Sequence, residues 1–211
     1  SSRRRHTRYW RDWSSDVCYS DLKYWSNELG GTYFNWPQVL IKDKYVNFKN
    51  WQERKNRTVM ILANKFSAKR DQNYSLRRKT WKIKDGDGNF AVDLFGASWN
   101  KGFFYDFQHF FGMLTRTRIS DWDFYSWIYL GKKQKNYLGT SSNKKVTAED
   151  YRINLVIENC SEYVSEKLFE AHLSQNIVIY VGANLASEGI NPGIAVEVPP
   201  KISSIKDAIK I

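Results

Sequence analysis

Cysteine and histidine are scarce in this chain, with two Cys and three His among 211 residues. The cysteines, Cys18 and Cys160, are too few for a disulfide framework, which excludes a small secreted scaffold and favours a reducing compartment. The histidines, His6, His109 and His172, do not have the spacing of zinc ligands. We therefore expect no zinc site, and no divalent metal or other cofactor is indicated.

Long apolar runs are also missing. None approaches the roughly 20 residues that a membrane-spanning helix needs, and charges stand where a signal peptide would be apolar. We therefore expect a soluble or peripheral protein, and a hydrophobic content of 42% is adequate for a buried core. The net charge of +11 indicates an anionic partner, either nucleic acid, an acidic membrane surface or a phosphorylated small molecule.

The first 22 residues differ in composition from the rest, with five Arg and no Lys. They resemble a translated sequencing-adapter end, and we expect this leader to be non-native. Its five Arg and three Asp contribute +2, so the remainder keeps a charge of +9. Residues 23–57 are aromatic-rich with little periodicity and are predicted to be an irregular connector. The interpretable domain is residues 58–211.

Apolar runs and helical patterns alternate within residues 58–211, which predicts a Rossmann-like parallel α/β sheet with ligands beyond the carboxyl ends of its strands. Ser75 is a possible helix cap. The stretch that ends at Lys145 is predicted to be a loop. Strands are expected at 58–63, 90–95, 152–157 and 177–181, with a further apolar run at 194–198, and helices at 74–84, 103–114, 164–173 and from about 202.

The segment NLVIENCSEYVSEK, residues 154–167, combines a strand end, a polar loop and a helix start near Tyr163. Unpaired N–H groups at a helix N-terminus suit a diphosphate, and Lys167 would add a full positive charge. Glu166 could accept hydrogen bonds from sugar hydroxyls. The ordinary alternative is that Glu166 caps the helix and Lys167 is a solvated surface residue.

Residues 151–182, YRINLVIENCSEYVSEKLFEAHLSQNIVIYVG, resemble the signature of the α-1,3/4-fucosyltransferase family, glycosyltransferase family 10. The family pattern is Tyr-x-Phe-x-Leu, Glu-Asn-Ser/Thr, Tyr-Val-Thr/Ser-Glu-Lys-Leu, and an apolar strand ending near Gly. Here Ile153 replaces Phe, and Cys160 replaces Ser or Thr. Weaker similarity extends over residues 58–205, including the segments LANK at 62–65, SLRRK at 75–79 and VDLFG at 92–96.

The resemblance implies the C-terminal, GDP-fucose-binding half of an inverting, two-domain GT-B fucosyltransferase. Lys167 and Arg78 would pair with the diphosphate, because cations stabilise the charge that develops on a departing β-phosphate. Glu166 would hold sugar hydroxyls and Tyr163 would line the nucleotide pocket. The donor-binding residues implied are Asn64, Arg78, with Arg77 as the alternative, Glu158, Asn159, Tyr163, Glu166 and Lys167.

No residue matches the family's catalytic base, which is expected in an N-terminal acceptor domain missing from this chain. Residues 23–57 could be a remnant of that domain, and the chain alone is expected to be inactive. The partners implied are GDP-fucose and an acceptor glycan, with no nucleic acid. We expect a bacterial cytoplasmic enzyme, or one peripheral to the inner membrane through the missing part; a eukaryotic one would lie at the Golgi membrane.

Three alternatives remain from the sequence. A GT-B enzyme could use another nucleotide sugar. The basic stretch Lys65 to Lys84, which contains Tyr74 and Trp81, could form a nucleic-acid surface. Independently of that, the ordinary alternative for Arg77 and Arg78 is a solvated basic helix face. Two Asp-x-Asp patterns, at 85–87 and 121–123, could hold a metal, although the first is an ordinary Asp-Gly turn sequence.

Overall fold

The computed structural model describes residues 48–65, 72–99 and 135–210. The chain divides into two compact units, Ser1–Trp36 and Pro37–Ile211. All described residues belong to the second unit. The predicted domain boundaries at residues 22/23 and 57/58 stay predictions, but the first strand, Lys55–Ile61, begins three residues before the predicted strand 58–63.

The described residues form a six-stranded sheet in which every neighbouring pair is parallel, in the order β3-β2-β1-β4-β5-β6. The chain adds β2 and β3 on one side of β1, then returns to place β4 on the other side. This is the Rossmann order, which confirms the predicted parallel α/β sheet. The strands are β1 Lys55–Ile61, β2 Val92–Phe95, β3 Tyr137–Gly139, β4 Tyr151–Ile157, β5 Ile177–Val181 and β6 Val196–Glu197.

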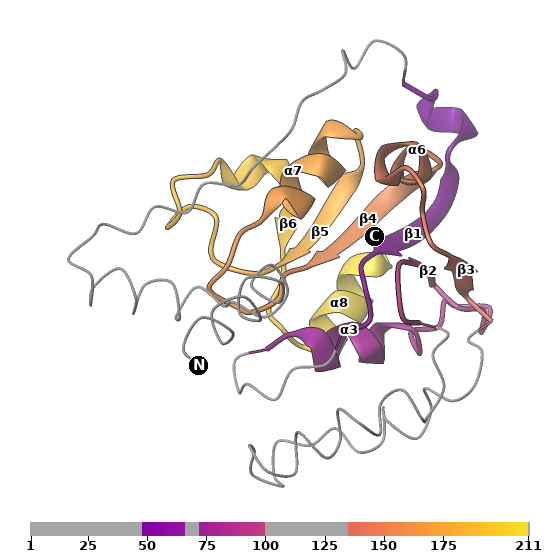
Figure 1. Cartoon of the computed structure of the whole chain (residues 1–211), viewed down its shortest axis with the longest axis horizontal. Helices are drawn as coiled ribbons and strands as arrows, with labels where there is room; N and C mark the ends of the chain where they lie inside the picture. The colour runs from indigo at the N-terminus through magenta and orange to yellow at the C-terminus, as the bar shows by residue number, and fades with distance from the viewer. Residues whose placement is uncertain (1–47, 66–71, 100–134, 211) are drawn as a thin grey trace, which may run out of the picture. The chain divides into compact units, whose positions relative to one another are not determined.

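Helices cover both faces of the sheet (Figure 1). Helices α3 and α8 pack together on one face, and α6 and α7 on the other. The crossovers through α3 and α7 run in opposite directions from the middle of the sheet, and right-handed crossovers then lie on opposite faces. The helices are α3 Tyr74–Thr80, α6 Lys144–Glu149, α7 Glu166–Leu173 and α8 Ile202–Ile209, with 3₁₀ turns η1 Trp51–Glu53 and η3 Pro192–Ile194.

The central strands are apolar on both faces. In β4, Leu155 and Ile157 join the core under α3 and α8, whereas Val156 joins the core under α7. In β5, Ile179 and Tyr180 divide in the same way. Successive side chains of a strand point to opposite faces of the sheet. Because helices cover both faces, successive positions of a central strand are all apolar.

Helix α3 is shorter than the predicted helix 74–84. It ends at Thr80, whose hydroxyl donates to the carbonyl of Arg77 at 2.7 Å. Beyond it, Lys84 pairs with Phe90 in an isolated antiparallel bridge, and β2 begins only at Val92. The Asp-Gly sequence between these residues forms a turn, as predicted.

The prediction that residues before Lys145 form only a loop is wrong, because β3 and the start of α6 lie there. Helix α6 begins after Asn143, whose side-chain oxygen accepts the N–H groups of Lys145 and Val146. Ser75 is not a cap, since the N-cap position of α3 is Asn73. The predicted helix 103–114 lies outside the described residues.

Candidate functional site

The carboxyl edge of the sheet between β1 and β4 is the point where the strand order reverses. Ligands of open α/β sheets bind at such a switch point, because the connecting segments leave on opposite faces. Asn64 follows β1, and Glu158 and Asn159 follow β4. The start of α3 is joined to the same loop, since the N–H of Asn73 donates to the carbonyl of Asn159 at 2.8 Å. The structure thus brings predicted residues from three elements to one edge.

Arg77 is buried in α3, with 2% of its surface exposed. Its guanidinium donates from Nε to the carbonyl of Ile157 at 2.9 Å and from Nη2 to the side-chain oxygen of Asn159 at 2.8 Å. Burial lowers the pKa of Arg77, against the opposing effects of Tyr74 and Glu158. The desolvated positive charge of Arg77 is therefore fixed against the end of β4 and the loop that follows it.

Arg78 is equally buried but contacts a different strand end. Its Nη1 donates to the carbonyl of Lys65 at 2.7 Å, just beyond β1. The alternative that Arg77 and Arg78 form a solvated basic helix face is wrong, because both are 2% exposed. Arg77 is hydrogen-bonded to the β4–α7 loop, and Arg78 to the segment that follows Asn64.

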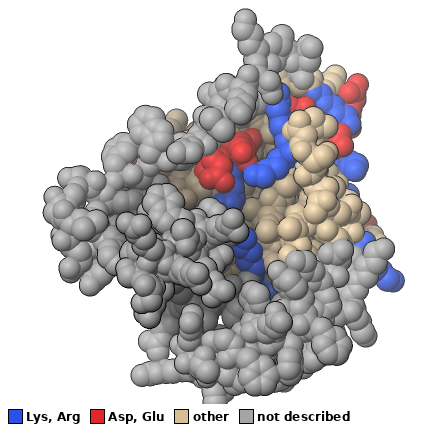
Figure 2. Space-filling model, in the orientation of Figure 1, with Lys and Arg blue, Asp and Glu red and all other residues tan. Residues whose placement is uncertain are grey.

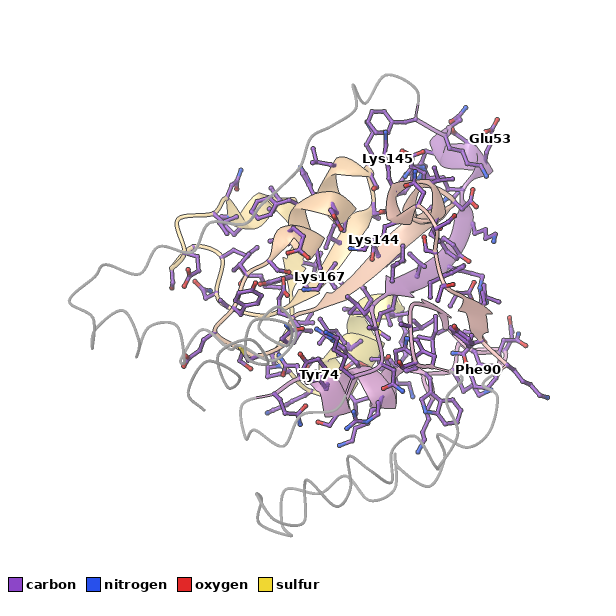
Figure 3. The ribbon with its side chains drawn as sticks, viewed as in Figure 1. Glu53, Tyr74, Phe90, Lys144, Lys145 and Lys167 are labelled. Carbon is purple, nitrogen blue, oxygen red and sulfur yellow. The ribbon has the colours of Figure 1, made fainter. Side chains whose placement is uncertain are left out.

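Helix α7 begins at Glu166 and is capped by Ser165, whose side chain accepts the N–H of Lys167. The helix therefore starts later than predicted, and Glu166 is its first residue rather than its cap. The Lys167 ammonium donates to Ser165 Oγ at 2.7 Å and to Glu158 Oε2 at 3.2 Å. The alternative of a freely solvated lysine is wrong. Figure 3 shows Lys167 at the start of α7 and Tyr74 at the start of α3.

Glu158 lies beneath this helix start and has no exposed surface. Its Oε1 accepts the backbone N–H of Ser165 at 2.8 Å, and both of its oxygens lie 2.8 Å from the Ser165 hydroxyl. Together with Lys167, whose side chain is 20% exposed, it forms a partly buried ion pair. We call Glu158, Ser165 and Lys167, with Arg77 on the same loop, the Glu158 cluster. It holds two cations and one carboxylate.

Tyr163 is half-buried and lies between this cluster and the end of β5. Its carbonyl accepts the hydroxyl of Tyr180 at 3.1 Å, and its ring centroid is 6.0 Å from the Lys167 ammonium. Burial and then Glu158 raise the pKa of Tyr180. Gly182 leaves room for this arrangement, because a Cβ there would overlap the Tyr180 hydroxyl and approach Glu158 Cγ to 2.9 Å.

Asn64 links the exits of β1 and β2. Its N–H donates to the carbonyl of Ala97 at 2.9 Å, and its side-chain amide donates to the carbonyl of Ser98 at 3.1 Å. Gly96 allows this approach, since it has a φ of +132° and a Cβ would overlap the carbonyl of Leu62. Asn64 therefore joins the segment after β1 to the segment after β2 at this edge of the sheet.

Two residues of the site were missed by sequence reasoning. Ser165 caps α7 and hydrogen-bonds to both Glu158 and Lys167. Gly182 leaves the space that the Tyr180 hydroxyl occupies. Ser is a preferred N-cap residue, and its position directly before Glu166 could have identified it. The requirement at Gly182 depends on Tyr180 folding back over it, which no sequence pattern reveals.

The rival patterns find ordinary structural roles where they are described. Asp85 Oδ1 accepts the N–H groups of Asp87 at 3.1 Å and Asn89 at 2.8 Å in an exposed turn. The pattern at 121–123 lies outside the described residues. Among residues 48–65, 72–99 and 135–210, no group of three His, Cys, Asp or Glu could hold a metal, and no helix is long and apolar enough to cross a membrane.

Comparisons with protein-family models, curated proteins and solved structures give no match to this chain. The resemblance to fucosyltransferases therefore depends on the motif residues themselves and stays a prediction.

Proposed function

We propose that the β1/β4 edge binds the diphosphate of a nucleotide sugar, and that the chain is the GDP-fucose-binding half of an inverting GT-B fucosyltransferase. The observation that carries this proposal is the convergence of Arg77 and Lys167 on one loop. These cations come from helices on opposite faces of the sheet, and both hydrogen-bond to the residues directly after β4.

The charge of this cluster favours an anionic ligand. Two cations, Arg77 and Lys167, lie close to the strand end, and the buried Glu158 carboxylate is already engaged by Ser165 and Lys167. Both cations also have N–H groups that are available to a ligand. Among the described residues, none accepts from Arg77 Nη1 or from the third N–H of the Lys167 ammonium. Charge-assisted hydrogen bonds to phosphate oxygens are about twice as strong as neutral ones.

The proposed reaction transfers fucose from GDP to a hydroxyl of an acceptor glycan with inversion at the anomeric carbon. Lys167 and Arg77 would stabilise the charge that develops on the departing GDP, and this stabilisation is largest where water is excluded. The half-buried Tyr163 would line the nucleotide pocket. The general base belongs to the acceptor domain that the family resemblance implies.

Glu166 has the chemistry to recognise the sugar. It is the first residue of α7 and half-buried, and no described residue hydrogen-bonds to its carboxylate. Fucose hydroxyls are donors that such a carboxylate can accept. We therefore expect Glu166→Gln to weaken binding of GDP-fucose while leaving the affinity for GDP unchanged.

The test is a calorimetric titration of the chain with GDP-fucose, GDP-mannose and UDP-sugars. We expect GDP-fucose to bind best, and Lys167→Ala and Arg77→Ala each to weaken binding by about 1.5 to 3 kcal/mol. Arg78→Ala, run in parallel, determines which arginine serves the diphosphate. Unchanged affinity in Lys167→Ala and in both arginine variants would remove the proposed site.

Lys144→Ala is the matched control. It also deletes one lysine, but Lys144 pairs with Glu170 at 3.3 Å and both side chains are exposed. Figure 2 shows that acidic and basic side chains lie side by side on the face in view. The GDP-fucose affinity of Lys144→Ala should equal that of the wild type. An equal loss in the control would mean that only the overall charge matters.

A further inference from the structure

Glu158 is the least accessible acid of the candidate site. It has no exposed surface, and its partners are the N–H and hydroxyl of Ser165 at 2.8 Å and the ammonium of Lys167 at 3.2 Å. A carboxylate without exposed surface acts on a ligand through its neighbours. Its effect on binding therefore depends on what it does to Ser165 and Lys167.

The hydrogen bonds of Ser165 run in one direction. A hydroxyl has a single proton to donate, and here it points to the Glu158 carboxylate. Its lone pairs are then left for the Lys167 ammonium at 2.7 Å and the Lys167 backbone N–H at 3.4 Å. Glu158 thus fixes Ser165 as an acceptor, and both residues hold the ammonium.

The Lys167 ammonium has three N–H groups, of which Glu158 and Ser165 accept two. No described residue accepts the third, and the side chain is 20% exposed. A lysine side chain normally loses much rotamer freedom when a ligand fixes it. A lysine that is fixed beforehand loses little more, and this strengthens binding.

We propose that Glu158 and Ser165 are positioning residues that fix the Lys167 ammonium before an anionic ligand binds and leave one N–H for a phosphate oxygen. This inference rests on the proposed function for its ligand. The geometry of the three side chains supports the positioning itself.

Charge alone predicts the opposite behaviour. Glu158 is negative and lies close to the proposed phosphate site, so its removal would strengthen anion binding if it did nothing else. In Glu158→Gln the amide oxygen still accepts from Ser165, but an amide N–H₂ can then face the ammonium, donor against donor. Positioning therefore predicts weaker GDP binding in this variant, and charge predicts tighter binding.

The first test needs no nucleotide. NMR spectra of lysine ammonium groups, labelled with the heavy nitrogen isotope, should show one slowly exchanging signal that is absent from Lys167→Ala. Glu158→Gln and Ser165→Ala should each lose that signal, whereas Ser165→Thr keeps the hydroxyl and should retain it. A signal that persists in Glu158→Gln, or in Ser165→Ala if Glu158→Gln does not fold, would overturn the proposal.

The second test is calorimetry with GDP. Glu158→Gln and Ser165→Ala should weaken binding about threefold to tenfold, and Ser165→Thr should not. In a Lys167→Ala background neither change should have a further effect, because coupled residues are not additive. Tighter binding, or the same loss in both backgrounds, would contradict positioning. If the wild type does not bind GDP, the proposed function fails, and the ammonium signal still decides the positioning.

Discussion

The structure contains two charged clusters, each built around a buried carboxylate, at different places in the sheet. The Asp93 cluster consists of Arg57, Asp93 and Tyr151. Arg57 donates to both oxygens of Asp93 and to the carbonyl of Phe90, and the Tyr151 hydroxyl donates to Asp93 at 3.0 Å. The Lys55 ammonium lies 3.4 Å from the Tyr151 hydroxyl on the other side, so this cluster also has more cations than carboxylates.

The two clusters differ in where they lie. Arg57, Asp93 and Tyr151 stand within β1, β2 and β4, and their hydrogen bonds connect these strands. The Glu158 cluster lies at the carboxyl edge, where the strand order reverses, and its two cations have N–H groups that no described residue accepts. Buried ionisable groups occur both in structural ion pairs and at functional sites, and the position at the switch point is what makes the Glu158 cluster the candidate for ligand binding.

The largest expected effect is on stability at the Asp93 cluster. Asp93 is 7% exposed, and Asp93→Ala leaves the Tyr151 hydroxyl without its acceptor and the Arg57 guanidinium with the carbonyl of Phe90 but no carboxylate. We expect a loss of about 3 kcal/mol in the free energy of unfolding, measured in urea, with GDP affinity unchanged.

Asp150→Ala is the control for this change. Its partner Lys49 lies at 2.7 Å, but both side chains are exposed, and exposed pairs contribute at most about 1 kcal/mol. Weaker GDP binding in Asp93→Ala, at a temperature where the variant is folded, would show that the two clusters are not independent.

A smaller loss of stability is expected at Gly182, beside the Glu158 cluster. Gly182→Ala places a Cβ against the Tyr180 hydroxyl and Glu158, which should cost about 1 to 3 kcal/mol in unfolding free energy. Gly86→Ala is the matched variant, because a Cβ there meets no atom within 4 Å. Equal melting temperatures for the two variants would show that Tyr180 can move aside freely.

Alkaline pH should give the smallest of these effects. Burial, with Glu158 second, raises the pKa of Tyr180 above its ordinary value of 10.0, and the neutral phenol is therefore favoured by folding. Its contribution to stability is complete below pH 10.0 and falls as the pH rises toward the folded-state pKa, by at most about 1.4 kcal/mol per pH unit.

Tyr180→Phe removes this proton and should flatten the decline of unfolding free energy above pH 10.0, relative to the wild type. Tyr151, whose pKa is also raised by burial, remains in both proteins and cancels in the difference. Parallel stability curves for wild type and variant would contradict the assignment.

The central strands were the most predictable part of the fold. The limits of β5 were predicted correctly, and those of β4 to within one residue, because continuous apolar runs between polar turns mark strands that are buried on both faces. Strand β3 and helix α6 were not predicted. They are short, and Leu138 and Val146 are exposed, so neither element carries an apolar period.

The candidate site was predictable as a set of residues but not as a set of contacts. The strand ends at Asn64 and Glu158 and the start of α7 follow from the α/β pattern. The burial of Arg77 and Arg78 does not, because their acceptors are the carbonyls of Ile157 and Lys65, and backbone carbonyls leave no mark in a sequence. The pairing of Glu158 with Ser165 and Lys167 depends in the same way on how the loop folds.

The most direct test of the claim that the Glu158 cluster binds a diphosphate is the difference in affinity between GDP and GMP. The two ligands share the base, the ribose and the α-phosphate, so the difference isolates the β-phosphate. We predict that the wild type binds GDP more tightly than GMP by about 1.5 kcal/mol or more, and that this difference shrinks in Lys167→Ala. Equal affinities for GDP and GMP in the wild type would contradict the account.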